Sequence, residues 1–168
     1  MKNHLSNERG LTLIELLFAM VITLILLSSL TSVLSVSLTT WRMENSRMAL
    51  QQKGRMAVNR VLREIGSGQK IKFLSSHSLE ITKKDGEINS FQLGGGLHGN
   101  TLYMMIDKNA SGGGIASCPL TENIVTELTF APFSQQKTQA VLITLVVKDQ
   151  NTGVEQRFHT ASYPWNQL

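Results

Sequence analysis

The longest charge-free stretch of the chain runs from Leu16 to Trp41 and contains 26 residues. In an α-helix each residue adds about 1.5 Å, so this stretch would be about 39 Å long, more than the roughly 30 Å of a bilayer's hydrocarbon core. One acid, Glu15, directly precedes it. The sequence therefore predicts a membrane-spanning helix near the N-terminus, with a carboxylate at its first turns.

The residues before this stretch help to decide what kind of apolar segment it is. Residues 1–10 form a polar leader with the basic residues Lys2 and Arg9. A secretory signal peptide has an apolar core of only about 7–15 residues, so this segment is too long for one. A plain signal anchor fits the length and the flanking charges. A plain anchor does not explain Glu15, however, because a carboxylate inside the hydrocarbon core costs about 2.5–3.5 kcal/mol. A partner with a positive charge would explain the acid.

Helical character continues beyond the apolar run. Between Thr39 and Ile65 there is no proline and one glycine, Gly54. Apolar residues recur there at spacings that place them on one helix face, namely Met43, Leu50, Ala57, Val58, Val61, Leu62 and Ile65. We therefore predict a single helix from about Leu11 to Ile65, about 80 Å long. Glycines at 66 and 68 are expected to end it.

The rest of the chain has the composition of β-strands. Alternating or β-branched segments predict strands at 70–74, 78–82, 87–93, 101–106, 125–130, 140–147 and 154–161. Residues 83–86 end in Asp-Gly and predict a hairpin turn. Residues 109–117 are glycine-rich and predict a loop. The nearly continuous apolar run at 140–147 predicts a central strand.

These elements define the expected fold class. A sheet with an apolar face needs cover, and the amphipathic part of the long helix is the only helical candidate. We expect an α+β fold in which a long protruding N-terminal helix packs its C-terminal half on a mostly antiparallel β-sheet. In the strand at 125–130, strict alternation would place Val125, Glu127 and Thr129 on one face and Thr126, Leu128 and Phe130 on the other.

The net charge of +4 comes mostly from a basic region just after the apolar run. Its residues are Arg42, Arg47, Lys53, Arg55, Arg60, Arg63, Lys70 and Lys72, opposed only by Glu44 and Glu64. The region is compatible with a solvated helix face, with contact to anionic lipid or a role in topology, and with DNA binding. DNA is the least supported partner, because no aromatic residues for base stacking are interleaved with these charges.

The sequence presents no arrangement of residues typical of an enzyme. The single cysteine, Cys118, excludes an intramolecular disulfide, and the four histidines are scattered. The glycine triplets at 94–96 and 112–114 lack the Lys-Ser/Thr of a phosphate loop. Asp107, Asn109 and residues 149–151 are interpreted as turns. We expect no catalytic residues, no metal, no cofactor and no small-molecule substrate.

Gly10 followed by Leu11-Thr-Leu-Ile-Glu-Leu-Leu17 resembles the class III signal of type IV pilins and type II secretion pseudopilins. The resemblance implies that prepilin peptidase cleaves between Gly10 and Leu11 and that Leu11 becomes the methylated N-terminal residue. Glu15 is then the fifth mature residue, where the family has its glutamate. Leu11 departs from the pattern, since most members begin with Phe.

The resemblance also implies a filament. Glu15 would neutralise the N-terminal amine of a neighbouring subunit and so fix the register between subunits. The apolar residues around and after it would form the membrane anchor and later the filament core: Leu13, Ile14, Leu16, Leu17, Phe18, Val21, Ile22, Leu24, Ile25 and Leu26. The expected partners are prepilin peptidase, other pilin or pseudopilin subunits and membrane lipid. The expected location is a single pass through the inner or plasma membrane with the C-terminal domain outside, then a pilus or pseudopilus.

The expected domain division is a cleaved leader at 1–10, a transmembrane and filament-core helix at 11–38, its amphipathic continuation at 39–65 and a β-rich globular domain at 66–168. Major pilins usually have a proline where this chain has Ser32, and often a C-terminal disulfide. This chain, with the segment 52–65, looks more like a minor pilin of the PilW class or a J-type pseudopilin. The filament would belong to a pilus, a competence system or type II secretion. The alternative is a signal-anchored extracytoplasmic binding or adhesin domain that does not polymerise.

Overall fold

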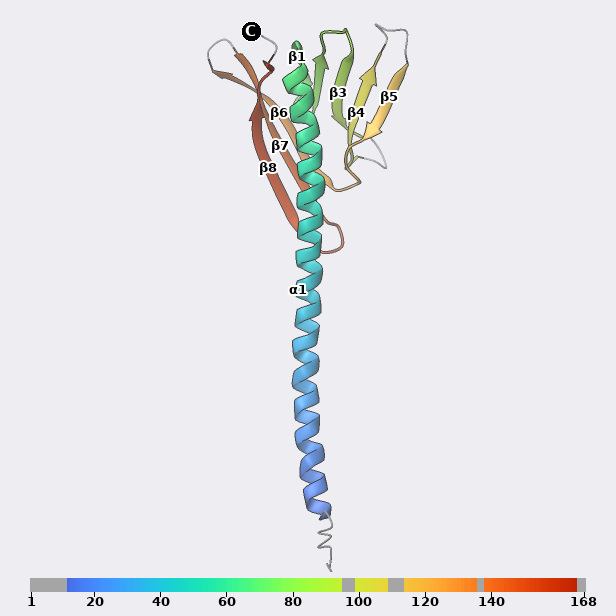
Figure 1. The fold of residues 1–168 in the computed structure, drawn as a ribbon, viewed down its shortest axis with the longest axis vertical. Coiled ribbons are helices and arrows are strands. Elements are labelled where there is room, and N and C mark those ends of the chain that lie inside the picture. Colours follow the sequence, from blue (N-terminus) through green and yellow to red (C-terminus); the bar gives the residue numbers. More distant parts are fainter. Residues whose placement is uncertain (1–11, 95–98, 109–113, 136–137, 166–168) are drawn as a thin grey trace, which may run out of the picture. The chain divides into compact units, whose positions relative to one another are not determined.

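The structure is a computed structural model that describes residues 12–94, 99–108, 114–135 and 138–165. A long helix, α1, extends over 55 residues from Leu13 to Ser67 (Figure 1). No proline interrupts it, so its backbone hydrogen-bond ladder is continuous. Gly68 donates its N–H to the carbonyl of Ile65 at 3.1 Å just past the helix end. The predicted helix is confirmed and ends two residues later than expected; its predicted start, Leu11, lies outside the described residues.

The chain divides into two compact units, residues 1–42 and 43–168. The division falls inside α1, so the two parts of this helix belong to different units. In the first unit the side chains of α1 are exposed throughout the described residues. In the second unit α1 packs against two antiparallel sheets, which confirms the predicted α+β class.

The first sheet has five strands that follow one another in chain order. They are β1 (Lys70–Ser75), β2 (Ser78–Thr82), β3 (Ile88–Leu93), β4 (Leu102–Asp107) and β5 (Ile115–Pro119). Gly86 has a positive φ of 84° in the turn between β2 and β3, a backbone conformation that glycine adopts without steric cost. The predicted hairpin is confirmed.

Strand β5 corrects the sequence prediction of a loop at 109–117. Residues 109–113 lie outside the described part of the chain, but Ile115–Ser117 belong to β5 and pair with β4. All five residues of β5 are exposed. Because neither face of the strand is buried, its sequence shows no alternation, and backbone pairing along a single edge holds it in the sheet.

The second sheet consists of β6 (Val125–Gln135), β7 (Thr138–Lys148) and β8 (Glu155–Ser162), with β7 in the centre as predicted. The register shifts between Val125 and Glu127, which marks a β-bulge. Val125 and Leu128 are therefore both buried, although strict alternation predicted opposite faces for them. The strand also continues past the predicted end at Phe130.

The core of the second unit lies between α1 and the two sheets. Five residues of the predicted helical stripe are buried: Leu50, Ala57, Val58, Val61 and Ile65. Leu62 is half-buried against this core, whereas Met43 is 48% exposed and does not belong to it. The helix packs closely on β8 at Gly54, where a Cβ would overlap the ring of Phe158. This glycine, which looked like an interruption in the sequence, permits the close approach of helix and sheet.

A buried charge network joins the end of α1 to the hairpin between β2 and β3. The side chain of Glu64 is 8% exposed, and its carboxylate pairs with Arg60 at 2.9 Å and with Lys83 Nζ at 3.1 Å. Asn89 donates its side-chain N–H to the same carboxylate at 2.8 Å, and Lys83 also pairs with Glu87 at 2.8 Å. Several partners compensate the charge of Glu64, which burial would otherwise make costly.

The network shifts the pKa values of Lys83 and Glu87, its two partly exposed residues. Partial burial works against the ammonium of Lys83, but hydrogen bonds from this group to Glu87 and Glu64 raise its pKa above the ordinary lysine value. The hydrogen bond from Lys83 lowers the pKa of Glu87. Both groups are therefore held in their charged forms.

Candidate functional site

The candidate site is the start of α1, where the sequence predicts processing and assembly. Gly10 and Leu11, the two residues of the predicted cleavage site, lie outside the described residues. The described chain begins at Thr12, and the helix begins one residue later. The structure thus shows the environment of Glu15 directly.

Thr12 and Glu15 form a capping box at the N-terminus of the helix. One carboxylate oxygen of Glu15, Oε2, accepts hydrogen bonds from the backbone N–H and the hydroxyl of Thr12, both at 2.9 Å. The N–H of Glu15 in turn donates to the Thr12 hydroxyl oxygen at 3.4 Å. This reciprocal arrangement satisfies backbone donors that a helix start leaves unpaired. It also places a negative charge at the positive end of the helix dipole.

The sequence analysis missed this role, although the signal for it is present. A Thr or Ser followed three residues later by Glu is the pattern of a capping box, and Thr12-Leu-Ile-Glu15 has it. The capping role uses only Oε2. The second oxygen, Oε1, accepts no hydrogen bond from the residues that the structure describes. Glu15 can therefore cap its own helix and still accept a donor from another molecule.

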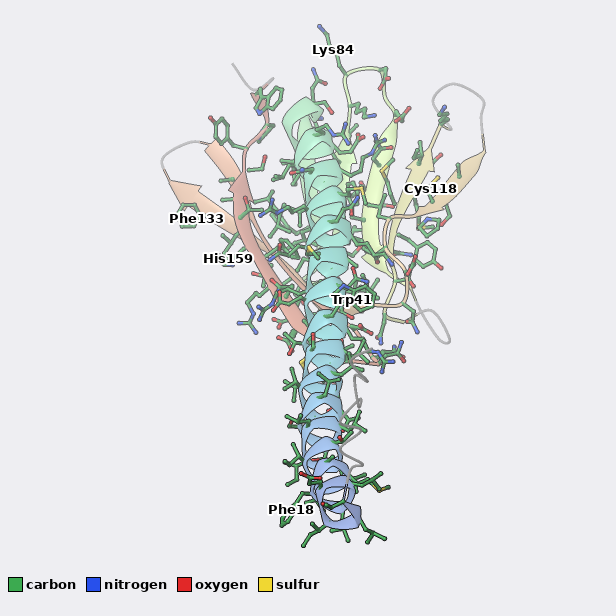
Figure 2. The ribbon with its side chains drawn as sticks, turned by 60° about the horizontal axis from the view of Figure 1, so that its bottom comes forward. Phe18, Trp41, Lys84, Cys118, Phe133 and His159 are labelled. Carbon is green, nitrogen blue, oxygen red and sulfur yellow. The ribbon has the colours of Figure 1, made fainter. Side chains whose placement is uncertain are left out.

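The apolar residues on both sides of Glu15 form an exposed surface. Among the ten residues assigned to the membrane or filament core, exposure ranges from 45% at Val21 to 84% at Leu13. Figure 2 labels one of them, Phe18, near the lower end of the helix. By length and composition this part of α1 is able to cross a membrane.

Eight of the nine serines and threonines between Thr23 and Thr40 donate their hydroxyl to a carbonyl of the helix, and Ser37 is the exception. Thr23 donates to the carbonyl of Ala19 at 2.7 Å, and Ser28 donates to that of Ile25 at 2.8 Å. The same i−3 or i−4 pattern holds for Ser29, Thr31, Ser32, Ser35, Thr39 and Thr40. A hydroxyl without a partner is costly in an apolar medium. These bonds let a serine- and threonine-rich helix enter lipid or a bundle of helices.

Residues 5–31 match the family described as "Prokaryotic N-terminal methylation motif". The N-terminus of this chain carries that motif. The match includes Gly10, Leu11, Glu15 and the first half of the apolar run, and it does not extend to the second unit. Neither the curated proteins nor the solved structures gave a match to the chain.

The methylation motif is the signal of type IV pilins and pseudopilins, and it implies processing by prepilin peptidase. Together with the exposed apolar helix, it indicates a protein that is anchored in a membrane or built into a pilus. The motif thus implies that a second protein, prepilin peptidase, acts on this end of the chain.

Outside the methylation motif, the predicted basic region divides into paired and unpaired residues. Lys53 bonds to Glu122 at 2.6 Å, Arg60 to Glu64 at 2.9 Å and Arg47 to Glu44 at 3.4 Å. Arg55 and Arg63 are exposed and form no ion pair with any residue that the structure describes. The region is thus partly a scaffold for the fold and partly a free positive surface.

The other groups considered in the sequence do not come together. Cys118 is exposed on the edge strand β5, and no group of three or more potential metal ligands occurs among the described residues. His159 contacts the hydroxyl of Thr144 at 3.0 Å, and His77 contacts that of Ser76 at 2.9 Å. His4, His98 and most of the residues of the two glycine triplets lie outside the described part of the chain.

Asp149 belongs to a turn, as the sequence suggested. Its carboxylate accepts hydrogen bonds from the Asn151 N–H at 2.9 Å and the Thr152 hydroxyl at 2.8 Å. The bond from the Asn151 backbone, with one from the Ser46 side chain, lowers the pKa of Asp149. The carboxylate stabilises the connection between β7 and β8 against α1.

Proposed function

We propose that this chain is a structural subunit of a type IV pilus, a competence filament or a type II secretion pseudopilus. In this proposal it is cleaved after Gly10, methylated at Leu11, held in the inner or plasma membrane and then drawn into the filament. The methylation motif carries the proposal. The exposed apolar helix supports it, because that surface has to be covered by lipid or by other helices.

Each successive segment of the chain has its own role in this proposal. Residues 1–10 are the leader that is removed, and 11–38 anchor the chain and later form part of the filament core. Residues 39–65 continue the helix and attach it to the globular domain at 66–168. The partners are prepilin peptidase, lipid and other subunits of the pilin type, and the chain itself performs no catalysis.

Glu15 has two roles in this proposal. Within the chain it caps α1 through Oε2. Between chains, its charge and its second oxygen pair with the N-terminal amine of a neighbouring subunit. In a bundle of apolar helices the effective dielectric is low, so such a pair is strong and depends on register. The mature amine at Leu11 would lie one residue before Thr12, at the same end of the helix.

Two substitutions separate these roles. Glu15→Gln keeps a side chain that serves in a capping box but removes the charge. Thr12→Ala removes the capping hydroxyl but keeps the charge. We expect the Glu15→Gln variant to remain in the membrane. Its amount in sheared filaments should be about tenfold or more below that of the wild type. The amount of the Thr12→Ala variant should decrease less, because the loss of a cap lowers helix stability by only about 0.5–2 kcal/mol. Incorporation of Glu15→Gln at the level of the wild type would overturn the intersubunit role.

Processing is tested at Gly10. Replacing Gly10 by Phe should leave the full chain uncleaved, because a bulky side chain would hinder the cut beside Leu11. N-terminal sequencing of the wild-type protein from membranes should start at a methylated Leu11, and that of the variant at the leader. Gly114→Phe is the matched control, since it also replaces a glycine by phenylalanine at a place where a Cβ meets no atom within 4 Å, and it lies far from the leader in the sequence. A mature wild-type chain that starts at Met1 would favour the alternative, an uncleaved binding or adhesin domain.

Within this family we propose a minor pilin of the PilW class or a J-type pseudopilin. Support comes from Ser32 at the position where major pilins have proline, from the single cysteine and from the segment 52–65. A minor subunit should be present in far fewer copies than the main subunit of its filament. Quantitative mass spectrometry of purified filaments measures this ratio, and equal abundance would overturn the assignment.

A further inference from the structure

A groove runs along the outer side of α1 in the second unit, and no role has been given to it so far. Its deeper part has a volume of about 740 Å3 and lies between the helix, at Met56 and Leu62, and the C-terminal end, at Trp165. A shallower part of about 390 Å3 continues toward Met48 and shares Met56 with the first. Four turns of helix, about 22 Å, separate Met48 from Arg63 at the other end.

The groove is lined by apolar side chains together with polar ones such as Gln51, Gln52 and Asn59, and a close contact holds its tryptophan. Trp165 packs on Gly66, where a Cβ would overlap the indole ring, yet its side chain remains 66% exposed. One part of the ring is thus held by the helix while the rest faces outward. Met56 is 56% exposed and Met48 is 60% exposed. Methionine and tryptophan are typical of surfaces that bind other proteins.

The charge of the groove is positive. Arg63 lines its deep part and Arg55 its shallow part. Both arginines lack an ion-pair partner among the described residues, and no aspartate or glutamate lines either part. Apolar side chains with arginines at the rim favour an occupant that is apolar on one face and acidic at its flanks.

We propose that this groove binds an acidic amphipathic helix from a different subunit, an inference that rests on the proposed role as a filament subunit. The groove has the length of about four helical turns and its charge is opposite to that of such a helix. A second copy of this chain is a poor occupant when packed helix against helix. The exposed charges of α1 after the apolar run are Arg42, Arg47, Arg55 and Arg63 against Glu44, so two copies would repel.

The test uses the full chain in nanodiscs of zwitterionic lipid. Trp41→Phe leaves Trp165 as the only tryptophan and thus as a reporter inside the groove. The probe is a synthetic helical peptide of about 16 residues with leucines on one face and glutamates on its flanks. A matched peptide has lysines in place of the glutamates, and empty nanodiscs measure binding to lipid.

We expect the glutamate peptide to shift the emission of Trp165 to shorter wavelength in a saturable way, and the lysine peptide to bind about tenfold more weakly or less. The double variant Arg55→Glu with Arg63→Glu should reverse this preference, and Met56→Glu should weaken binding about tenfold. Lys84→Glu with Lys108→Glu is the control, because both lysines are exposed outside the groove. Figure 2 shows Lys84 at the hairpin between β2 and β3.

Three results would overturn the inference. The first is equal binding of the two peptides, and the second is no saturable change up to about 1 mM peptide. The third is self-association of the chain that Met56→Glu abolishes, since this would make a second copy the occupant. Glu15→Gln should bind the peptide like the wild type, so a failure of the groove is distinguishable from a failure of the filament role.

Discussion

Ile25 and Ile65 lie in the same helix, yet Ile25 is 62% exposed and Ile65 is 0% exposed. The first belongs to the unit formed by residues 1–42 and the second to the unit formed by residues 43–168. In the second unit, the sheets of the same chain cover the helix. In the first unit, the helix has an apolar surface that no described part of its own chain covers. In the proposed function, lipid or the helices of other subunits cover this surface.

The polar groups of the two halves differ in the same way. In the first half, Thr12 bonds to Glu15 and the hydroxyls bond to carbonyls one turn away, so hydrogen bonding is local. In the second half, Glu64 bonds to Lys83 and Lys53 bonds to Glu122, which lie in other elements. A segment that moves between lipid and protein cannot depend on fixed distant partners. A segment inside a permanent core can.

The largest expected effect tests the difference between buried Ile65 and exposed Ile25. Ile65→Ala should lower the free energy of unfolding of the globular unit by about 2–5 kcal/mol, because it leaves a cavity at a fully buried site. Ile25→Ala should change that quantity by less than about 0.5 kcal/mol. Amide hydrogen exchange of β7, measured by mass spectrometry on the full chain in nanodiscs, reports the global opening. Equal effects of the two variants would contradict the distinction.

A smaller effect is expected in the charge network. Lys83→Met removes one of the partners of the buried Glu64 carboxylate and should cost about 1–3 kcal/mol by the same exchange measurement. The neighbouring Lys84 is exposed, so Lys84→Met is the matched control and should stay within about 0.5 kcal/mol. If the two variants are equally stable, the network does not hold the hairpin to α1.

The smallest expected effect is on pH dependence. The folded state lowers the pKa values of Glu87 and Asp149, so their stabilisation is complete above the ordinary carboxyl pKa and is lost as the pH falls through the lowered values. We expect the stability of the globular unit to decline below about pH 4.3. Glu87→Gln should make the decline shallower and Glu15→Gln should not alter it. A decline of the same slope in Glu87→Gln would show that Lys83 does not stabilise the charged form of Glu87.

Local sequence patterns predicted much of the fold because the corresponding elements are stabilised locally. The long helix lacks proline, and the hairpin at residues 83–86 has its glycine at the position of positive φ. Residues 140–147 of the central strand β7 are nearly all apolar, so composition alone indicated this strand, although its neighbours and the core stabilise it. The capping box of Thr12 and Glu15 also follows a local pattern, and the sequence could have predicted it.

The elements that were missed depend on distant partners. Strand β5 has no buried face and exists because β4 offers a backbone edge. The bulge near Val125 shifts the register so that Val125 and Leu128 both reach the core. The alternation of residues along the strand does not reveal such a shift. The pairing of Glu64 with Lys83 joins residues of two elements whose distance only the packed structure fixes.

By itself, the sequence determined the methylation motif, the helix that follows it and the α+β class, because these depend on composition and short spacings along the chain. Only the tertiary structure decided that Met43 lies outside the covered stripe of the helix, why Gly54 and Gly66 are glycines, and where the groove beside Trp165 lies. Those features arise from surfaces that meet across many residues, so their physical cause is contact between elements and not the preference of any one segment.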